Sequence, residues 1–286
     1  MSADAGLAGR AFVWLQYMLP HHAISRLVLA ATRVKTAWFK NTLISGFLRL
    51  YAVNMSDAQT VDPLGFATFN EFFTRALKPT ARTVAQSSEI VVSPVDGTVS
   101  ECGAITADRL LQAKSQDYRL ADLLAGQEWR RAFEGGTFCT IYLAPYNYHR
   151  IHMPARGKLL STVYVPGRLF SVNATTARHV PRLFARNERV LTLFETAFGK
   201  MAVILVGALN VGGMATVWTG DITPAPRRRI TVLPQTDLIL DKAAELGRFN
   251  MGSTVIVLFE PDRVNLAPQL HAGSRVRFGE ELARVR

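Results

Sequence analysis

The residues best suited to chemistry are two histidines, an aspartate and a serine that lie far apart along the chain. His149 and His152 fall three residues apart in YNYHRIHMP, with a proline on either side of the pair. Asp96 lies in SPVDGTV, and Ser253 follows Gly252 in FNMGSTVIVLF. Serine is a weak nucleophile until a base takes its proton, and a histidine oriented by a carboxylate is a common base. These residue types could therefore build a nucleophilic site if the fold brings them together.

Each of these motifs also has a purely structural interpretation. An isolated H-x-x-H pattern is more often one packed and one solvated histidine, Asp-Gly is a common hairpin turn, and Gly-Ser before a buried strand is usually a turn. The flanking prolines argue against a regular helix around the histidines, and a flat strand would place the two rings on opposite faces. An irregular turn must therefore present His149 and His152 if both act together.

Several other kinds of site are excluded by the absence of their motifs. The sequence contains no G-x-S-x-G, no G-x-G-x-x-G, no P-loop and no H-E-x-x-H. Its two cysteines, Cys102 and Cys139, form no strong zinc pattern and fit a reduced compartment rather than a disulfide scaffold. We therefore expect no metal.

Short strands are the elements that must position these residues. Apolar runs separated by Pro, Gly and Asn turns predict strands at 89–92, 98–102, 137–143, 159–165, 190–194, 201–206, 214–219, 229–233, 254–259 and 282–285. Helical pieces are predicted near 66–77, 120–125 and 174–184. The predicted fold class is α+β, with a β-rich catalytic core of short, mostly antiparallel strands, barrel- or sandwich-like, and N-terminal amphipathic helices.

The charge of the chain is concentrated at its beginning. The 286 residues carry a net charge of +11 although 49% of them are hydrophobic, and no acid occurs between Ala5 and Ser56. A basic and apolar segment of this kind fits an anionic membrane surface, although an amphipathic helix packed on the domain would look similar. Arg26, Arg33 and Lys40 are spaced by seven and would share a polar face if one helix ran through them. We expect residues 1–56 to form an amphipathic helical membrane-association segment and residues 57–286 to form the catalytic domain.

Neither a signal peptide nor a transmembrane span is expected. Charged residues are spread among the apolar residues of 1–56, whereas a signal peptide has an uninterrupted apolar stretch. The 20-residue stretch 201–220 lacks charge, but glycines and Asn210 interrupt it, so we expect two buried strands joined by a turn at 210–213. Nucleic-acid binding is disfavoured because no exposed basic and aromatic module is recognisable.

Eight blocks of the sequence resemble bacterial phosphatidylserine decarboxylases of the membrane-associated, pyruvoyl-dependent type. The blocks are TFNEFFTRALKPTARTV (68–84), SPVDGTVS (93–100), LQAK (111–114), LADLLAG (120–126), GTFCTIYLAPYNYHRIHMPARGKL (136–159), YVPGRLFSVN (164–173), VPRLFARNERV (180–190) and GRFNMGSTVIVLF (247–259). YHRIHMP and FARNERV are too long to match by chance. One departure is Met251, where the family usually has leucine before GST.

The resemblance implies that the enzyme makes its own cofactor by autocatalytic cleavage. Ser253 Oγ would attack the carbonyl of Gly252, with His152 as base and Asp96 orienting it, so that Asp96, His152 and Ser253 form a self-cleavage triad. Gly252 would allow a strained turn at the bond that breaks. The products would be a large chain (1–252) and a small chain (253–286), with a covalent pyruvoyl group on the former Ser253.

The resemblance also implies the reaction and its setting. Phosphatidylserine would be decarboxylated to phosphatidylethanolamine and CO2 through a Schiff base to the pyruvoyl group, with His149 as the acid that protonates the resulting carbanion. The protein would lie peripherally on the cytoplasmic face of the cell membrane, as a homodimer of large and small chain pairs. The alternatives are an uncleaved serine hydrolase and an inactive membrane-binding homologue. Candidates for holding the substrate phosphate are Arg150, Arg168, Arg186 and Arg189.

Overall fold

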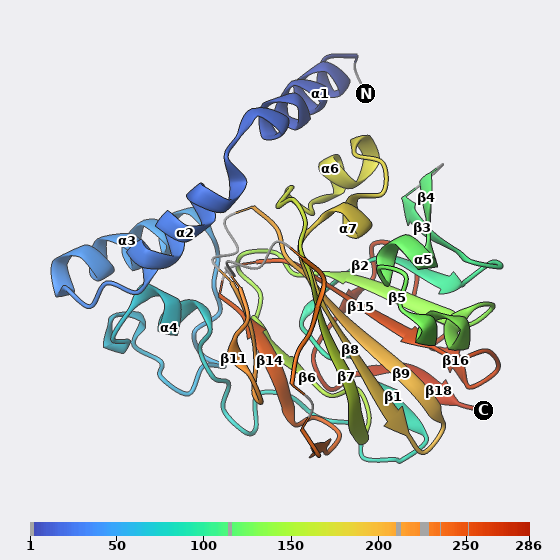
Figure 1. Cartoon of the computed structure of the whole chain (residues 1–286). Coiled ribbons are helices and arrows are strands. Elements are labelled where there is room, and N and C mark those ends of the chain that lie inside the picture. Colours follow the sequence, from blue (N-terminus) through green and yellow to red (C-terminus); the bar gives the residue numbers. More distant parts are fainter. Residues whose placement is uncertain (1–2, 114–115, 210–212, 224–228, 235, 251) are drawn as a thin grey trace.

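The computed structural model describes residues 3–113, 116–209, 213–223, 229–234, 236–250 and 252–286. A strand-rich body carries three helices at its N-terminal end (Figure 1). These helices are α1 (Ala3–Met18), α2 (His21–Thr32) and α3 (Ala37–Leu50). Short helices cover other edges of the body: η1 (Pro63–Gly65), α4 (Phe69–Phe73), α5 (Leu120–Leu123), η2 (Glu128–Phe133), α6 (Ala174–His179) and α7 (Leu183–Arg186).

A nine-stranded antiparallel sheet forms the body. Its order is β12 (Thr231–Val232), β7 (Gly157–Val165), β8 (Arg189–Thr196), β9 (Gly199–Val206), β15 (Thr254–Phe259), β5 (Thr137–Tyr142), β2 (Gly97–Ala104) and β17 (Arg275–Val276), with β13 (Ile239–Leu240) also on β7. β15 lies in the middle and pairs over six residues with both β9 and β5. Every residue of β15 is buried, as its continuous apolar run TVIVLF predicts for a central strand.

Three smaller sheets complete the fold. The first joins β1 (Ile90–Val92), β18 (Glu281–Val285) and β16 (Val264–Leu266). The second joins β11 (Gly220–Asp221), β10 (Met214–Thr216), β14 (Glu245–Phe249) and β6 (Arg150–His152), and the third is the pair β3 (Arg109–Ala113) and β4 (Gln116–Arg119). The predicted α+β class with short antiparallel strands is confirmed.

The predicted helix near 66–77 is wrong in length, and the condition for a shared polar face near the N-terminus is not met. The run 66–77 forms only the single turn α4, because the backbone leaves the helical conformation after Phe73 and Thr74 is the C-cap. Arg26, Arg33 and Lys40 do not share one helix, since α2 ends at Thr32 and α3 begins at Ala37. Lys40 is instead buried and donates to the carbonyl of Leu64.

The uncharged stretch 201–220 forms strands, as predicted. It contains most of β9 and all of β10, while residues 210–212 of the predicted turn lie outside the described residues. In the parts of the chain that are described, no helix combines the length and the apolar character needed to cross a membrane.

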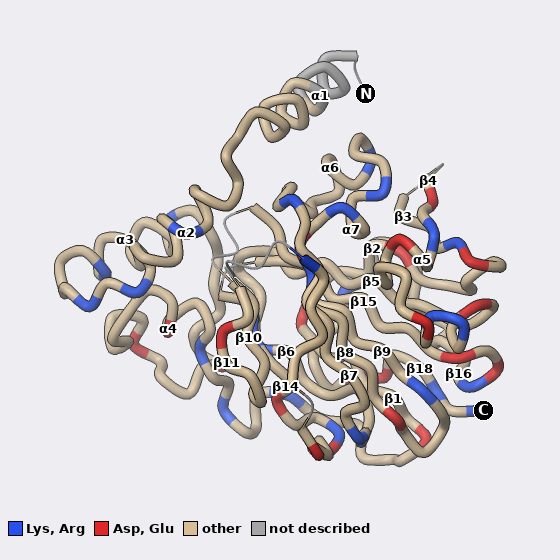
Figure 2. The backbone as a smooth tube through the Cα atoms, viewed as in Figure 1, with Lys and Arg blue, Asp and Glu red and all other residues tan. Residues whose placement is uncertain are grey.

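The N-terminal helices are attached to the body by specific contacts. Gln16 of α1 accepts a hydrogen bond from the Ser171 backbone at 2.8 Å, and Arg33 forms an ion pair with Asp221 at 2.6 Å. Figure 2 shows Lys and Arg but no acidic residue along α2 and α3. The same three helices expose a set of large apolar side chains: Phe12, Trp14, Leu15, Tyr17, Met18, Leu27, Trp38 and Leu50.

Candidate active site

Gly252 and Ser253 lie immediately before the central strand β15. The Ser253 carbonyl accepts a hydrogen bond from the Leu143 backbone at 2.9 Å, which ties this point to the segment after β5. Ser253 is fully buried, and its Oγ has no hydrogen-bond partner among the described residues. A buried hydroxyl without a partner is costly, so this atom is a candidate for function.

His149 lies beside this serine. A Cβ placed on Gly252 would be 3.5 Å from His149 Nε2. Nδ1 donates to the Asn147 carbonyl at 2.9 Å, so Nε2 carries the lone pair. This nitrogen is buried, with no hydrogen-bond partner in the part of the chain that the structure describes. Burial first, and the charge of Arg75 second, lower the pKa of His149 to about 3. His149 is therefore a neutral imidazole whose free lone pair faces the Gly252–Ser253 region.

His152 is placed differently, although it is only three residues away. It ends β6, where its Nδ1 donates to the Ala243 carbonyl at 2.8 Å and its Nε2 accepts from the Tyr148 hydroxyl at 2.8 Å. Its ring stacks on Phe278 with centroids 3.8 Å apart. Burial is the largest cause lowering its pKa. Both nitrogens of His152 thus have partners other than Ser253 and Asp96.

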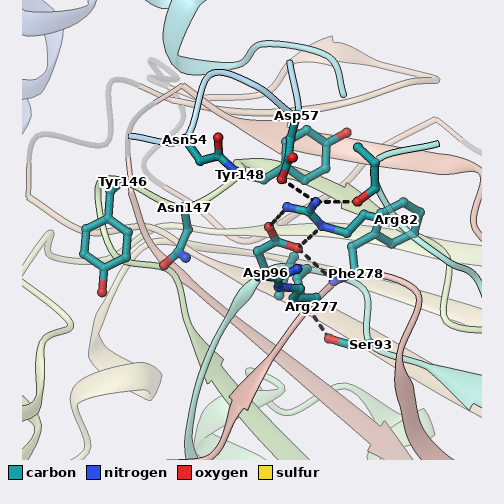
Figure 3. Close-up of polar contacts among 12 residues, drawn as sticks. Asn54, Asp57, Arg82, Ser93, Asp96, Tyr146, Asn147, Tyr148, Arg277 and Phe278 are labelled. Atoms are coloured by element: carbon teal, nitrogen blue, oxygen red, sulfur yellow. Dashed lines mark hydrogen bonds and ion pairs between the residues drawn. The ribbon is translucent and has the colours of Figure 1, made fainter. Parts of the chain in front are cut away.

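Asp96 is one end of a chain of ion pairs centred on Arg82 (Figure 3). Arg82 donates to both of its carboxylate oxygens, at 3.1 and 2.5 Å, and also to Asp57 at 2.8 Å. The Phe278 backbone N–H donates to Asp96 at 2.9 Å, while the Phe278 ring stacks on His152. Asp96 and His152 therefore contact the same residue without a hydrogen bond to each other.

Gly97, next to Asp96, has to be a glycine because β2 approaches β5 very closely there. A Cβ at this position would lie 2.6 Å from the Tyr142 carbonyl oxygen. A Cβ on Gly252 would meet only ordinary contacts, at 3.5 Å from His149 Nε2 and from the Leu143 carbonyl oxygen. The expected strained turn at Gly252 includes Met251, which lies outside the described residues, so it stays a prediction.

A cavity of about 500 Å³ opens at Gly252. Phe73 and Leu143 line it from the body, and Phe47 and Tyr51 line it from α3 and the residue after it. The cavity is large enough for a small headgroup, and one wall belongs to the N-terminal helices. In the described parts of the chain, no group of three or more His, Cys, Asp and Glu residues is placed to hold a metal ion.

The structure adds residues that sequence reasoning missed. Arg82 binds Asp96, Tyr148 binds His152, and Arg75 lies close enough to His149 to lower its pKa. Both arginines lie in the block TFNEFFTRALKPTARTV, but their spacing gave no signal that either would contact the site. Of the predicted set, the structure brings His149 to Gly252 and Ser253, and leaves Asp96 and His152 engaged elsewhere.

Comparisons with known proteins place the chain in a family. The family profile described as phosphatidylserine decarboxylase matches residues 69–284, and a second profile, described as PSD, matches residues 11–52. The phosphatidylserine decarboxylase proenzyme of Pseudomonas aeruginosa is 51% identical over 279 residues, which cover 96% of each chain. The proenzymes of Pseudomonas putida and Pseudomonas entomophila are 49% and 50% identical over 282 residues, 97% of this chain and 98% of theirs. The chain belongs to the phosphatidylserine decarboxylase family.

Proposed function

We propose that this protein decarboxylates phosphatidylserine to phosphatidylethanolamine and CO2, using a pyruvoyl group made by cutting its own chain between Gly252 and Ser253. The observation that carries the proposal is the pair of buried, unpartnered polar atoms at that bond, Ser253 Oγ and His149 Nε2, beside a cavity of about 500 Å³. Family membership and the word proenzyme in the names of the relatives support it. Both atoms fit a site where the α-carbon of residue 253 becomes a reactive ketone.

The cut is carried by residues of the chain alone. Ser253 Oγ attacks the Gly252 carbonyl carbon, so the C–N bond breaks and an ester forms. Elimination across Cα and Cβ of residue 253 then releases Gly252 as a carboxylate. Water attacks the resulting imine carbon, the nitrogen of residue 253 leaves as ammonia, and a ketone remains. We assign proton removal from Ser253 to His152, supported by Asp96. This role requires His152 Nε2 to exchange the Tyr148 hydroxyl for Ser253.

His149 is assigned to proton movement during decarboxylation. The pyruvoyl carbonyl would supply the electron sink that loss of CO2 needs. The substrate amine arrives as an ammonium and has to lose protons before it reacts. Neutral His149 can accept one at Nε2, because Asn147 holds the other proton at Nδ1. The same nitrogen can return that proton to the substrate carbon after CO2 leaves.

The N-terminal helices support a peripheral membrane location. Residues 1–56 are proposed as the membrane-association segment of a catalytic domain formed by residues 57–286. Exposed Trp14, Leu27 and Trp38 accompany an excess of Lys and Arg, a pattern that favours docking on an anionic surface. Because Phe47 and Tyr51 also line the cavity at Gly252, a phospholipid could pass from the surface to the site along α3. Assembly into a homodimer remains a prediction.

Intact-mass measurement of the purified protein tests the proposal. We expect two chains, 1–252 and 253–286, with the smaller one lacking a free amino group at its start. Ser253→Ala should give one uncut chain of 286 residues, and His149→Ala should be cut but release little CO2. An uncut wild-type chain that hydrolyses esters would instead support the serine hydrolase alternative. Full CO2 release by His149→Ala would contradict the role assigned to His149.

A further inference from the structure

A second cavity, which we call the arginine cavity, lies on the Asp96 side of the site. It has a volume of about 200 Å³ and is lined by Arg75, Arg82, Arg275, Arg277, Asp57 and Asp96. Four arginines face two aspartates, an excess of two positive charges. Gly252 lines the larger cavity and not this one, and the two cavities share no lining residue. Apart from the supporting role proposed for Asp96 in the cut, the reaction described above gives the arginine cavity no part.

Arg75 is buried there without an anionic partner. Its side chain is 4% exposed, and it forms no ion pair with any described residue. Within the described ranges, Arg75 Nε has no hydrogen-bond partner, and the side chain makes a single hydrogen bond, from Nη2 to the Tyr146 carbonyl at 3.3 Å. Burial lowers the pKa of Arg75 to about 10, which leaves it charged at neutral pH. Its other contacts are the Phe72 ring, whose centroid lies 5.9 Å away, and the charge of Asp96, which acts on it without an ion pair. A buried charge with one long hydrogen bond and no ion pair is costly, so its retention calls for a ligand.

Arg189 shows what a structural buried arginine looks like in the same protein. It is 2% exposed, and its nitrogens donate four hydrogen bonds of 2.7–2.9 Å to backbone carbonyls. Its pKa is also lowered to about 10 by burial. Burial is thus alike in the two residues, and only Arg189 has its donors satisfied. Free donors are therefore not a consequence of burial alone, and those of Arg75 are specific to the arginine cavity.

The other arginines of this cavity divide into two kinds. Arg82 is fully engaged by Asp57 and Asp96. Arg275 and Arg277 reach the cavity from β17 and the residue after it, are exposed, and form no ion pair with a described residue. Three arginines therefore have charge available to a ligand: one buried at the wall and two at the opening.

We propose that the arginine cavity binds a phosphate group, with Arg75 as its main ligand. Guanidinium groups match phosphate oxygens with paired, charge-assisted hydrogen bonds, and a tetrahedral anion can accept them from several directions at once. The size of the cavity suits a single phosphate better than a larger anion. Ala52 and Asn54, just after α3, also line it, which places it beside the proposed membrane-association segment. The phosphate could belong to a phospholipid headgroup or be free in solution.

A bound phosphate would also act on His149. The charge of Arg75 is the second cause lowering the pKa of this histidine. An anion on Arg75 would offset that charge and make protonation of His149 Nε2 easier. Phosphate binding would thereby favour the protonated His149 that returns a proton to the substrate carbon.

Thermal unfolding of the uncut Ser253→Ala chain tests binding without requiring cleavage or catalysis. Inorganic phosphate should raise its Tm relative to chloride at equal ionic strength, because a ligand of the folded state stabilises that state. Adding Arg75→Met should weaken phosphate binding at least about tenfold. Adding Arg156→Met, which removes the same charge from an exposed ion pair with Asp241, should leave binding unchanged. Arg75→Lys, which keeps the charge, should bind phosphate with an affinity between that of Arg75→Met and that of the parent Ser253→Ala chain.

A structural role for Arg75 makes a different prediction. Arg75→Met should not lower the Tm of the ligand-free protein, whereas Arg189→Met should, because it removes four hydrogen bonds to backbone carbonyls. Equal losses in the two variants would overturn the proposal. So would a Tm that responds neither to inorganic phosphate nor to soluble glycerophosphoserine.

The two sources of phosphate are separated by the processed enzyme. If the headgroup of the substrate occupies the cavity, glycerophosphoserine should protect the uncut chain, and Arg75→Met should raise KM for phosphatidylserine micelles at least about tenfold. If free phosphate is the ligand, inorganic phosphate alone should protect and KM should stay unchanged. Either result supports the site. Failure of the wild-type chain to cut itself would reject the proposed function and leave these binding measurements valid.

Discussion

Two histidines three residues apart acquire opposite roles from their neighbours. His149 is completely buried and has one free nitrogen, whereas His152 is held at both nitrogens by Ala243 and Tyr148. Residue type and spacing gave no way to tell them apart, because the difference depends on Arg75, Phe278 and other residues far away in sequence. Arg82 was missed for the same reason, because its role depends on ion pairs with Asp57 and Asp96, which only the fold brings close to it.

At the residue scale, His149 should make the folded state sensitive to acid. Its pKa is about 3 in the folded chain and 6.5 in an unfolded one, so between these values the unfolded state binds a proton that the folded state does not. Stability is therefore complete above about pH 6.5 and falls as the pH drops, at about 1.4 kcal/mol per pH unit for this group. His152 and His21 shift in the same direction and add to the slope.

Urea unfolding of the Ser253→Ala chain between pH 7.5 and 5 measures this slope. Adding His149→Asn removes the titration and keeps a donor for the Asn147 carbonyl. The variant should lose up to about 2 kcal/mol less than its parent between pH 6.5 and 5. A cavity left by the substitution would lower the free energy of unfolding equally at every pH, so the slope with pH could still be measured. Identical slopes would show that His149 is not held neutral.

At the scale of elements, strands were more predictable than helices. The runs at 137–143, 201–206 and 254–259 became β5, β9 and β15 within about one residue at most ends, because buried central strands need continuous apolar sequence. The break between α2 and α3 was not predictable, since no Pro or Gly marks it. It arises where the Arg33 and Val34 amides bond to carbonyls three residues back, and Arg33 is held by Asp221 of β11.

The exposed apolar residues of α2 and α3 should carry membrane attachment. Leu27 and Trp38 are each 72% exposed, so replacing both with alanine removes little packing from the fold. Inserting such side chains into a bilayer interface contributes about 1.5–3 kcal/mol each at full burial, so the double variant should bind vesicles containing phosphatidylglycerol at least tenfold more weakly. Co-sedimentation at fixed salt measures this loss.

A matched control comes from the body of the protein. Val232 of β12 is 63% exposed and lies outside the helices, so Val232→Ala should bind vesicles like the wild type. Raising the salt concentration should weaken attachment of the wild type, because the Lys and Arg excess acts through screened charge. Equal binding of vesicles by the double variant and by Val232→Ala would show that the exposed apolar residues of the helices do not carry membrane attachment.

At the scale of the whole molecule, the proposed cut divides the chain at the centre of its main sheet. Residues 253–286 supply β15, which pairs with both β9 and β5, and β18, which pairs with β1 and β16. The small chain also supplies Phe278, whose backbone holds Asp96 and whose ring stacks on His152. Cutting the backbone before β15 removes none of these contacts, so the fold should survive it.

The two chains should therefore stay together until the protein unfolds, and then fail to reassemble easily. Before unfolding, the cut protein should elute as one species in size exclusion and give two chains only under denaturing conditions. After dilution from urea at low micromolar concentration, Ser253→Ala should regain its native signal. The cut enzyme should regain less, and its recovery should rise with protein concentration, because β15 must find its place between β9 and β5 as a separate molecule. Concentration-independent recovery of the cut enzyme would show that the large chain forms its sheet without the central strand.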